Sequence, residues 1–408
     1  MKVVMRRTLS DIPDHMKSEY VDALHVLKRN GTYDRYVQMH LDNQQEVHMG
    51  PAFLAWHREF LRRFELDLQQ AANNPLLGLP YWDWALDSPP RPGFSSIWDP
   101  AFMGPNGQDP DGQVMDGSFA YNKGNWTLNV RINSEEPTPY LKRQFGRNPD
   151  ARSLPTPDDV MDTISATPFD VSPWNEHSES GFRNRLEGFI PSNRLNMHNR
   201  VHAWVGGSMM PVTSPNEPAF WWHHCFVDKL WADWQAMNPQ AARYLPTSGA
   251  APGHNLNDPM PPWDKASDTV TPAKVLDHRK LGYRYDTEDY LLPGEELPPF
   301  EWIWSANRGY ILWLTDSGRL YLDRDLGGGR IWDSGTRDPN LKAGKCIMQE
   351  DGNLVSYDPS NKVIWESGTT GNRNSRLVVR DIGGVRNEGS VALYKPDASS
   401  PFWWQPKG

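Results

Sequence analysis

Residues 198–207 read His-Asn-Arg-Val-His-Ala-Trp-Val-Gly-Gly, and residues 219–231 read Ala-Phe-Trp-Trp-His-His-Cys-Phe-Val-Asp-Lys-Leu-Trp. His198 and His202 are four positions apart, so on a helix their imidazoles project from one face and can converge on one ion. The apolar residues of the second stretch predict another helix over about 219–236, and this helix also carries histidine. The two stretches together predict a pair of helices with a metal-binding face.

A second group of histidines, His40, His48 and His57, lies nearer the N-terminus. Apolar residues recur at helical spacing in residues 11–40 and 50–72, so His40 would end one helix and His57 would lie inside the next. His48 would then belong to the connecting loop. Neutral imidazoles suit copper, zinc, iron and nickel, so the residue type alone does not choose the metal.

The composition limits the classes of fold and partner. A chain of 408 residues is too long for one ordinary core and predicts two or three domains. Its two cysteines cannot form a disulfide framework, and its formal net charge of -9 argues against nucleic acid and anionic membrane surfaces as partners. No apolar run reaches the length of a signal segment or a spanning helix, so the expected location is the cytoplasm, with export alongside a partner left open.

The pattern of residue types changes along the chain. Residues 85–175 are rich in Pro, Gly, Asp and Asn with little periodicity, which predicts long irregular connections over a helical core. Beyond residue 300, short alternating runs of strand formers are broken by Gly and Asp. The predicted organisation is a mainly α-helical domain over 1–290, an acidic and Pro-rich linker over 291–300 and an all-β domain over 301–408.

A repeat is visible in the predicted β domain. Ile303-Trp304, Ile331-Trp332 and Ile364-Trp365 recur at similar intervals, and Phe402-Trp403-Trp404 closes the series. Repeats that cannot bury a core alone usually form a symmetric β assembly.

The histidine-rich stretches resemble the motifs of the tyrosinases and catechol oxidases, the family with a type 3 pair of copper ions. The first motif, residues 48–61, reads His-Met-Gly-Pro-Ala-Phe-Leu-Ala-Trp-His-Arg-Glu-Phe-Leu. The second comprises residues 198–207 and 216–231, and the Tyr-Trp-Asp-Trp sequence at 81–84 is another feature of the family. The resemblance covers about residues 5–290 and implies a helical-bundle core with long loops.

The resemblance implies two copper ions, each held by three histidines, with O2 as a co-substrate. The implied ligands are His40, His48 and His57 for one ion, and His198, His202 and His224 for the other. The neighbours His223 and His224 point about 100° apart on a helix, so they cannot both face one ion. The motif of related oxygen carriers, in which only the second of these positions is histidine, favours His224. No cysteine lies near His48, so the thioether that some relatives form to this histidine is not expected.

The implied activity is ortho-hydroxylation of a small monophenol and oxidation of o-diphenols to o-quinones, the chemistry that leads to melanin. Three alternatives remain open: a catechol or o-aminophenol oxidase that lacks the hydroxylation, an O2 carrier like the hemocyanins, and a lectin with an inactive copper domain. A copper-delivery partner is compatible with the resemblance.

Two further residues match positions that tyrosinases are thought to use in holding a water. By resemblance, Glu187 and Asn199 would polarise a water that accepts the phenolic proton. Their joint presence favours true hydroxylation of monophenols. The alternative is that Glu187 pairs with Arg183 or Arg185 on a solvated helix face.

Other residues near the motifs are expected to support the centre. Arg58 and Asp228 follow the last histidine of each group and would orient the ligand helices, or form an ordinary ion pair. The substrate pocket is expected to involve residues that could equally serve to turn the chain: Phe189, Val205, Gly207, Met210 and Pro211. The histidines expected to be ordinary surface or core residues are His15, His25, His177, His254 and His278.

Residues 349–357 read Gln-Glu-Asp-Gly-Asn-Leu-Val-Ser-Tyr and fit the Q-x-D-x-N-x-V-x-Y motif of the bulb-type mannose-binding lectins. Strand alternation would place one face of the motif toward a mannose-type glycan. The residues on that face are Gln349, Asp351, Asn353, Val355 and Tyr357. The resemblance covers about residues 300–408 and implies a three-fold β-prism.

The motif is degraded in the other two repeats, so at most one sugar site is expected. A single shallow site binds weakly without multivalency. Two alternatives remain open: the repeat is purely structural, or the domain covers the coppers before activation. In the second case the residues that would plug the pocket are Tyr394, Phe402, Trp403 or Trp404.

Overall fold

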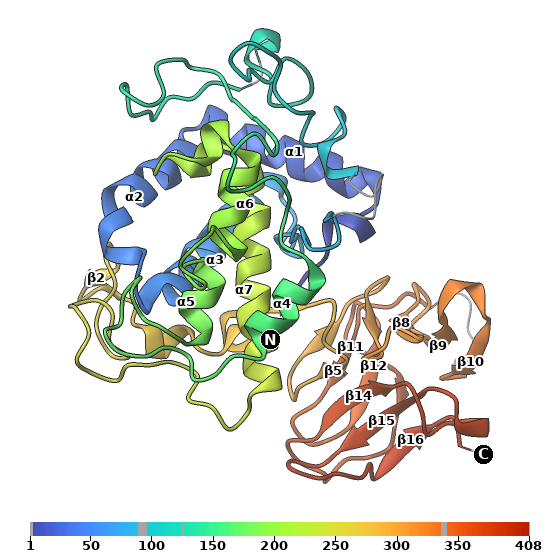
Figure 1. Ribbon diagram of the computed structural model, residues 1–408. Coiled ribbons are helices and arrows are strands. Elements are labelled where there is room, and N and C mark those ends of the chain that lie inside the picture. The colour runs from blue at the N-terminus through green and yellow to red at the C-terminus, as the bar shows by residue number, and fades with distance from the viewer. Residues whose placement is uncertain (1–2, 89–95, 125, 336–340, 408) are drawn as a thin grey trace. The chain divides into compact units, whose positions relative to one another are not determined.

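The computed structural model describes residues 3–88, 96–124, 126–335 and 341–407, and these form two compact units (Figure 1). Residues 6–281 form a helical unit, and residues 282–407 form a strand-rich unit together with residues 3–5. The main-chain N–H of Val4 donates to the carbonyl of Gly282 (2.8 Å), which explains why the first residues belong with the second unit.

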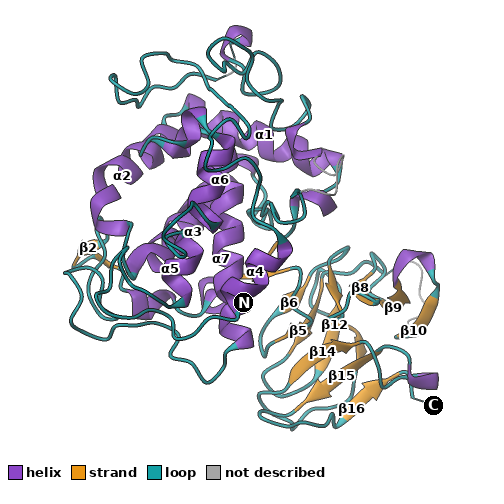
Figure 2. Cartoon of the chain, in the orientation of Figure 1, coloured by secondary structure: helices purple, strands orange, loops and turns teal. Residues whose placement is uncertain are grey.

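The helical unit is built around its longest helices (Figure 2). Its α-helices are α1 (Asp14–Arg29), α2 (Thr32–Val47), α3 (Ala52–Ala72), α4 (Pro157–Ile164), α5 (Phe182–Glu187), α6 (Met197–Val205) and α7 (Ala219–Met237). Nearly every residue of α7 before Gln235 is buried, as its apolar composition requires of a central helix. The rings of Phe64 on α3 and Trp221 on α7 stack with centroids 3.5 Å apart. Among the described residues, no helix combines the length and apolarity needed to span a membrane.

The single helix predicted over 11–40 is wrong. Gly31 has φ +80° and separates α1 from α2, because a left-handed residue ends a helix and glycine adopts that conformation without a steric penalty. His40 therefore lies inside α2 and not at its end, and His48 directly follows the last helical residue.

The irregular region predicted over 85–175 agrees with the described residues of that region. Its only α-helix there is α4, which begins with a capping box between Thr156 and Asp159. The bounds of α5 were not predicted, because such a short segment carries no measurable period, although one interpretation of Glu187 assumed a helix face there. A small hairpin, β2 (Asp264–Lys265) and β3 (Asp268–Thr269), lies later in the unit.

The strand-rich unit contains three four-stranded antiparallel sheets among its described residues. Each sheet joins three consecutive strands to one earlier strand, in the orders β10-β9-β8-β7, β13-β12-β11-β6 and β16-β15-β14-β5. The strands are β5 (Tyr290–Leu291), β6 (Glu296–Leu297), β7 (Trp302–Trp304), β8 (Tyr310–Leu314), β9 (Leu320–Arg324), β10 (Arg330–Asp333), β11 (Lys345–Met348), β12 (Leu354–Tyr357), β13 (Val363–Glu366), β14 (Arg376–Arg380), β15 (Ser390–Tyr394) and β16 (Trp403–Gln405). β1 (Val4–Arg6) and β4 (Tyr283–Tyr285) complete the strands of the chain.

The linker predicted over 291–300 is corrected by this topology. β5 and β6 hydrogen-bond to β14 and β11, so the acidic segment supplies a strand to each of two sheets. Two-residue strands are too short to show alternation, which is why the sequence pattern resembled a linker.

The sheets enclose one apolar core, which includes Leu312, Leu354 and Leu393, all fully buried. Strand alternation directs every second residue inward, as in the buried and half-buried pattern of β8 and β14. The repeated tryptophans Trp332 and Trp365 lie with ring centroids 6.0 Å apart, and Trp403 lies 6.3 Å from Trp365. Trp403 therefore packs against the core of its own unit.

Because each unit has its own core, a cavity in one should destabilise that unit alone. Leu312→Ala is expected to lower the free energy of unfolding of the strand-rich unit by about 2–5 kcal/mol. Val363→Ala, at a half-exposed position of β13, is the control and should change it by less than about 0.5 kcal/mol. Urea unfolding followed by hydrogen exchange would measure both effects, and equal loss of protection in α3 and α7 would contradict the division.

Candidate metal centre

Two groups of histidine nitrogens converge inside the helical unit. The ligand atoms lie within 4.8 Å of one another in each group, and the members are His40, His48 and His57 in the first, and His198, His202, His223 and His224 in the second. The rings of His57 and His224 stack with centroids 4.4 Å apart, so the two groups adjoin. The structure thus brings together all six histidines that the sequence indicated.

Five of the six rings turn Nδ1 toward a main-chain carbonyl. The pairs are His40 with Val212 (2.6 Å), His48 with Gln44 (3.1 Å), His57 with Phe53 (2.8 Å), His198 with Glu187 (3.2 Å) and His202 with Met209 (2.7 Å). An imidazole that donates through Nδ1 has its lone pair on Nε2, which is how protein metal ligands are usually oriented.

The Nε2 atoms have the environment that a cation requires. His224 Nε2 lies 3.3 Å from Nε2 of both His198 and His202, so lone pairs point at one another there. Among the described residues, the buried Nε2 atoms of His40 and His57 have no hydrogen-bond partner. Buried polar atoms normally have partners, so both groups fit a bound metal ion.

Burial also keeps these imidazoles neutral. It lowers the pKa of His48 and of His202 to about 4, and it lowers the pKa of the other four rings well below the ordinary value. A neutral ring offers its lone pair to a metal at pH 7 without first losing a proton.

His223 belongs to the second group by distance but differs from His224 in its contacts. Its ring stacks beside His198 with centroids 5.1 Å apart, and neither of its nitrogens has a hydrogen-bond partner among the described residues. The contacts of His224 Nε2 with both histidines of α6 favour His224 as the third ligand.

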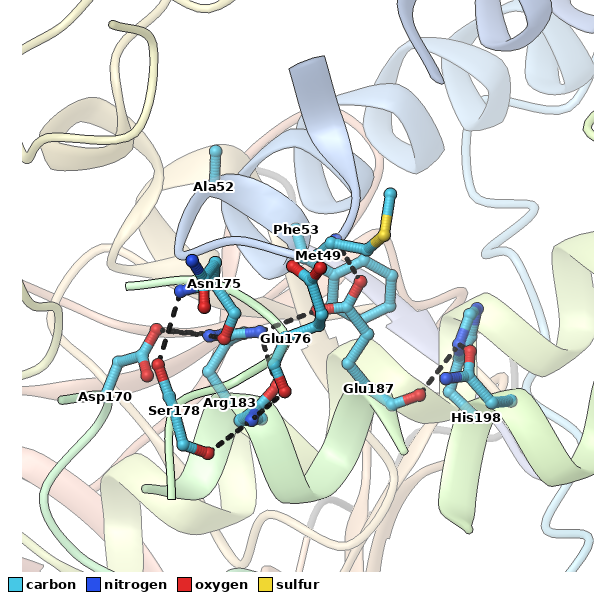
Figure 3. Close-up of polar contacts among 12 residues, drawn as sticks. Met49, Ala52, Phe53, Asp170, Asn175, Glu176, Ser178, Arg183, Glu187 and His198 are labelled. Atoms are coloured by element: carbon cyan, nitrogen blue, oxygen red, sulfur yellow. Dashed lines mark hydrogen bonds and ion pairs between the residues drawn. The ribbon is translucent and has the colours of Figure 1, made fainter. Parts of the chain in front are cut away.

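Glu187 connects the two groups (Figure 3). Its carbonyl accepts from His198, and its Oε1 accepts from the main-chain N–H of Met49 (2.5 Å), the residue that follows His48. Its Oε2 accepts from Arg183 Nη1 (2.9 Å). The pairing with Arg183 was one of the two sequence interpretations, but the pair is buried and not solvated.

The charges around Glu187 form a buried chain. Arg183 also pairs with Asp170 (2.7 Å), and all three side chains are at most 1% exposed. Burial raises the pKa of Glu187 to about 7, although Arg183 lowers it. Asp170 was not singled out from the sequence, and nothing in its spacing from Arg183 indicates that the two residues meet.

Arg58 and Asp228 join the two central helices. Arg58 Nε donates to Asp228 Oδ1 (2.5 Å), and the Arg58 guanidinium also lies 3.8 Å from the ring centroid of Trp231. Arg6 Nη1 donates to the other oxygen of Asp228 (3.1 Å). Because His57 precedes Arg58 and α7 carries His224, this pair fixes the helices that bear one ligand of each group.

The proposed ligands differ in exposure. His48 and His202 are half-buried, whereas the other four residues are at most 4% exposed. Asn199 is half-buried, and its Oδ1 lies 3.0 Å from His198 Nδ1. The centre is therefore least buried at His48 and His202.

The residues expected in the substrate pocket differ in exposure. Met210 is exposed, Phe189 and Pro211 are half-buried and Val205 is fully buried. Gly207 approaches Lys142 so closely that an added Cβ would lie 2.3 Å from that carbonyl oxygen. This close approach supports the interpretation that Gly207 serves to turn the chain.

His254 has a structural role that agrees with the ordinary one expected from the sequence. Its Nδ1 accepts from the main-chain N–H of Ala52 (3.3 Å), at the start of α3, and its ring fills the space beside Gly50. A side chain at Gly50 would clash with this ring, so the turn between His48 and α3 requires glycine.

Asp228→Asn should destabilise the helical unit, because it removes the carboxylate that contacts the buried guanidinium groups of both Arg6 and Arg58. The expected loss is about 3–5 kcal/mol in the free energy of unfolding, measured by urea denaturation. Asp233→Asn, on the same helix but paired at the surface with Lys229, is the matched control and should cost less than about 1 kcal/mol. Equal effects of the two changes would contradict this role of Asp228.

Comparison with known proteins gives matches to both units. The common central domain of tyrosinase matches residues 30–237. The tyrosinase of Streptomyces antibioticus is 42% identical over 292 residues, which cover 70% of this chain and all of that protein. A polyphenol oxidase from Thermothelomyces thermophila is a structural neighbour with a TM-score of 0.52 and 23% identity, covering 69% of this chain and 88% of that one. The mannose-specific agglutinin of snowdrop bulbs matches 30% of this chain and all of its own, with 26% identity and a TM-score of 0.23.

Two neutral histidine trios with converging Nε2 atoms thus lie within the region that matches the tyrosinase domain, and the identity to a tyrosinase extends over that protein's whole length. The chain therefore belongs to the tyrosinase family and is a type 3 copper phenol oxidase.

Proposed function

We propose that the protein uses O2 to hydroxylate monophenols at the ortho position and to oxidise o-diphenols to o-quinones. One observation carries this proposal. His224 Nε2 on α7 lies 3.3 Å from the Nε2 atoms of two histidines on α6, and this group adjoins the trio of His40, His48 and His57. In this proposal the trio holds one copper ion, and His198, His202 and His224 hold the other.

The protein's own contribution is to orient ligands, exclude water and manage a proton. Bound copper supplies the activation of O2 and the transfer of electrons, which no side chain can perform. The helical unit buries four of the six ligands and leaves His48 and His202 half-buried, so we propose that the phenol enters beside these two residues. A phenol that enters there must lose a proton whose pKa is roughly 10 in water.

Asn199 and Glu187 are the proposed holders of the water that takes this proton. Asn199 is half-buried, and its amide is next to His198. Each oxygen of Glu187 has one protein donor, from Met49 or Arg183, and a carboxylate oxygen can accept a second. General base catalysis of this kind typically contributes 10²–10⁴-fold, by order of magnitude.

The same contacts favour a second candidate, an oxidase of catechols or o-aminophenols without the hydroxylation. If Glu187 serves only to hold Met49 and His198, no base remains for a monophenol. An O2 carrier is less well supported, because the half-buried His48 and His202 leave the centre accessible.

Asn199→Ala separates these candidates. If Asn199 holds the water, the ratio of tyramine hydroxylation to catechol oxidation should fall by at least about tenfold, with catechol oxidation kept. Glu187→Gln should lower the same ratio, and Arg185→Gln, on the same helix without these contacts, is the control. The measurement is quinone absorbance under air with copper-loaded protein. Catechol oxidation by the original protein with no tyramine hydroxylation would support the oxidase without hydroxylation. Where the original protein hydroxylates tyramine, an unchanged ratio in Asn199→Ala would contradict the proposed role of Asn199.

For the strand-rich unit, we propose a three-fold β-prism with at most one site for a mannose-type glycan. Three sheets around one core support the architecture. The motif does not lie on one strand face as the sequence predicted, because residues 349–353 form the turn between β11 and β12. Gln349 Nε2 nevertheless donates to Tyr357 Oη (2.6 Å), so the two ends of the motif meet.

Asn353 is the weakest member of this proposed sugar site. It is 3% exposed; its amide donates to Glu366 Oε2 (2.7 Å) and accepts from Ser367 and from the main-chain N–H of Thr369. The polar atoms of its side chain are therefore already hydrogen-bonded to other residues of the strand-rich unit. Replacing it with Asp would place a carboxylate against Glu366 and test stability, not sugar binding.

Asp351→Asn is the better test of sugar binding. Its Oδ1 accepts from the main-chain N–H of Asn353 (3.0 Å), a bond that asparagine can also form. If the site binds mannose, the change should abolish retention on a mannose column, while Glu350→Gln in the same turn should not. If the column retains neither the original protein nor any variant, the repeats have a structural role alone.

A further inference from the structure

Residues 207–213, here called the strap, contact one proposed ligand of each copper ion. The carbonyl of Met209 accepts from His202 Nδ1 (2.7 Å), and the carbonyl of Val212 accepts from His40 Nδ1 (2.6 Å). A carbonyl that accepts from Nδ1 fixes the tautomer and the rotation of a ligating ring. The position of the strap therefore affects both halves of the centre.

One end of the strap is held by Lys142. The main-chain N–H of Ser208 donates to the Lys142 carbonyl (2.9 Å), and the N–H of Lys142 donates to Ser208 Oγ (3.1 Å). Gly207 permits this approach, because any larger residue would place its Cβ against the same carbonyl. This end is bound through the main chain.

The other end of the strap is held by a side-chain contact. Thr213 Oγ1 donates to Glu136 Oε2, next to the residue whose carbonyl contacts His40. Thr213 is fully buried and Glu136 is 7% exposed. A buried carboxylate is costly unless its contacts compensate for lost hydration, and Glu136 Oε1 has no hydrogen-bond partner among the described residues. The bond to Thr213 is thus a main contact of this side chain.

A cavity of about 90 Å³ lies on one side of the strap, and its lining includes Glu136, Lys142, Gly207 and Pro211. Side chains do not fill this space, so the strap has no packing support on that side, although Met209 itself is fully buried. The contacts at the two ends therefore contribute to the position of the middle part. Both carbonyls that contact histidine lie in that middle part.

We propose that Glu136 and Thr213 are positioning residues for the copper centre, which set His40 and His202 together through the strap. Neither side chain touches a proposed ligand ring. The inference rests on the proposed function only for the identity of the metal. It assigns to one hydrogen bond, remote from the ligands, control over the affinity of both ions.

The test is a competition for Cu(I) between the copper-loaded full chain and a colorimetric chelator, bathocuproine disulfonate. Thr213→Val should weaken the retention of both ions together by about tenfold, the lower end of what outer contacts of metal ligands contribute. Thr213→Ser keeps the hydroxyl and should restore the original affinity. Thr163→Val removes another buried threonine hydroxyl, on α4, and is the matched control that should retain both ions as the original protein does.

Thr213→Val leaves the buried carboxylate of Glu136 without the Thr213 hydroxyl. A second variant is needed in case this loss unfolds the protein. Glu136→Gln combined with Thr213→Val removes the hydroxyl and the charge together and should show the same tenfold loss. The proposal would be overturned if the folded double variant kept its affinity for both ions, or if it lost only one ion. A lower melting temperature alone would not rescue it. An original protein that binds two copper ions but oxidises no phenol would instead contradict the proposed function and leave this inference intact.

Discussion

The helical unit depends on an electrostatic conflict between neutral imidazoles. Lone pairs on the Nε2 atoms of His198, His202 and His224 face one another at 3.3 Å, and burial prevents the rings from relieving the repulsion by taking up protons. A cation resolves the conflict, but only if each ring keeps its orientation when the cation is absent. Main-chain carbonyls that accept from Nδ1 provide this orientation for five of the six rings, and His224 is the exception. Two of the carbonyls belong to residues four positions before the histidine, and the other three come from segments outside the ligand's helix.

Buried ion pairs connect other parts of the helical unit. Arg58 with Asp228 joins α3 to α7, and Arg143 pairs with Glu217 through two bonds of 2.8 and 2.7 Å. Arg143 also donates to the carbonyls of Met103 and Gly104, so one guanidinium orders an irregular segment against the start of α7. Long segments without helix or strand have few regular main-chain bonds, and buried arginine, with its five donors, satisfies several carbonyls at once.

The sequence predicted the histidines well because their signal is local. The spacing of His198 and His202, and the helix around His57, follow from helical geometry, and the bond from His57 to Phe53 is a further consequence of the same turn. The bonds from His40 to Val212 and from His202 to Met209 could not be predicted, since they involve main-chain atoms of an aperiodic segment. Residues 291–300 were mistaken for a linker for a related reason: β5 and β6 in and beside this segment are too short to alternate.

The contact between Val4 and Gly282 has a consequence for how the two units are connected along the chain. Residues at both ends of the helical unit are tied into the other unit at one place, so in sequence the helical unit is an insertion into the strand-rich one. An inserted domain whose ends lie together can be given new ends elsewhere with little loss, which makes circular permutation of residues 6–281 feasible. It also means that Val4 and Gly282 pair only across the whole length of the helical unit, and long-range pairing of this kind slows folding.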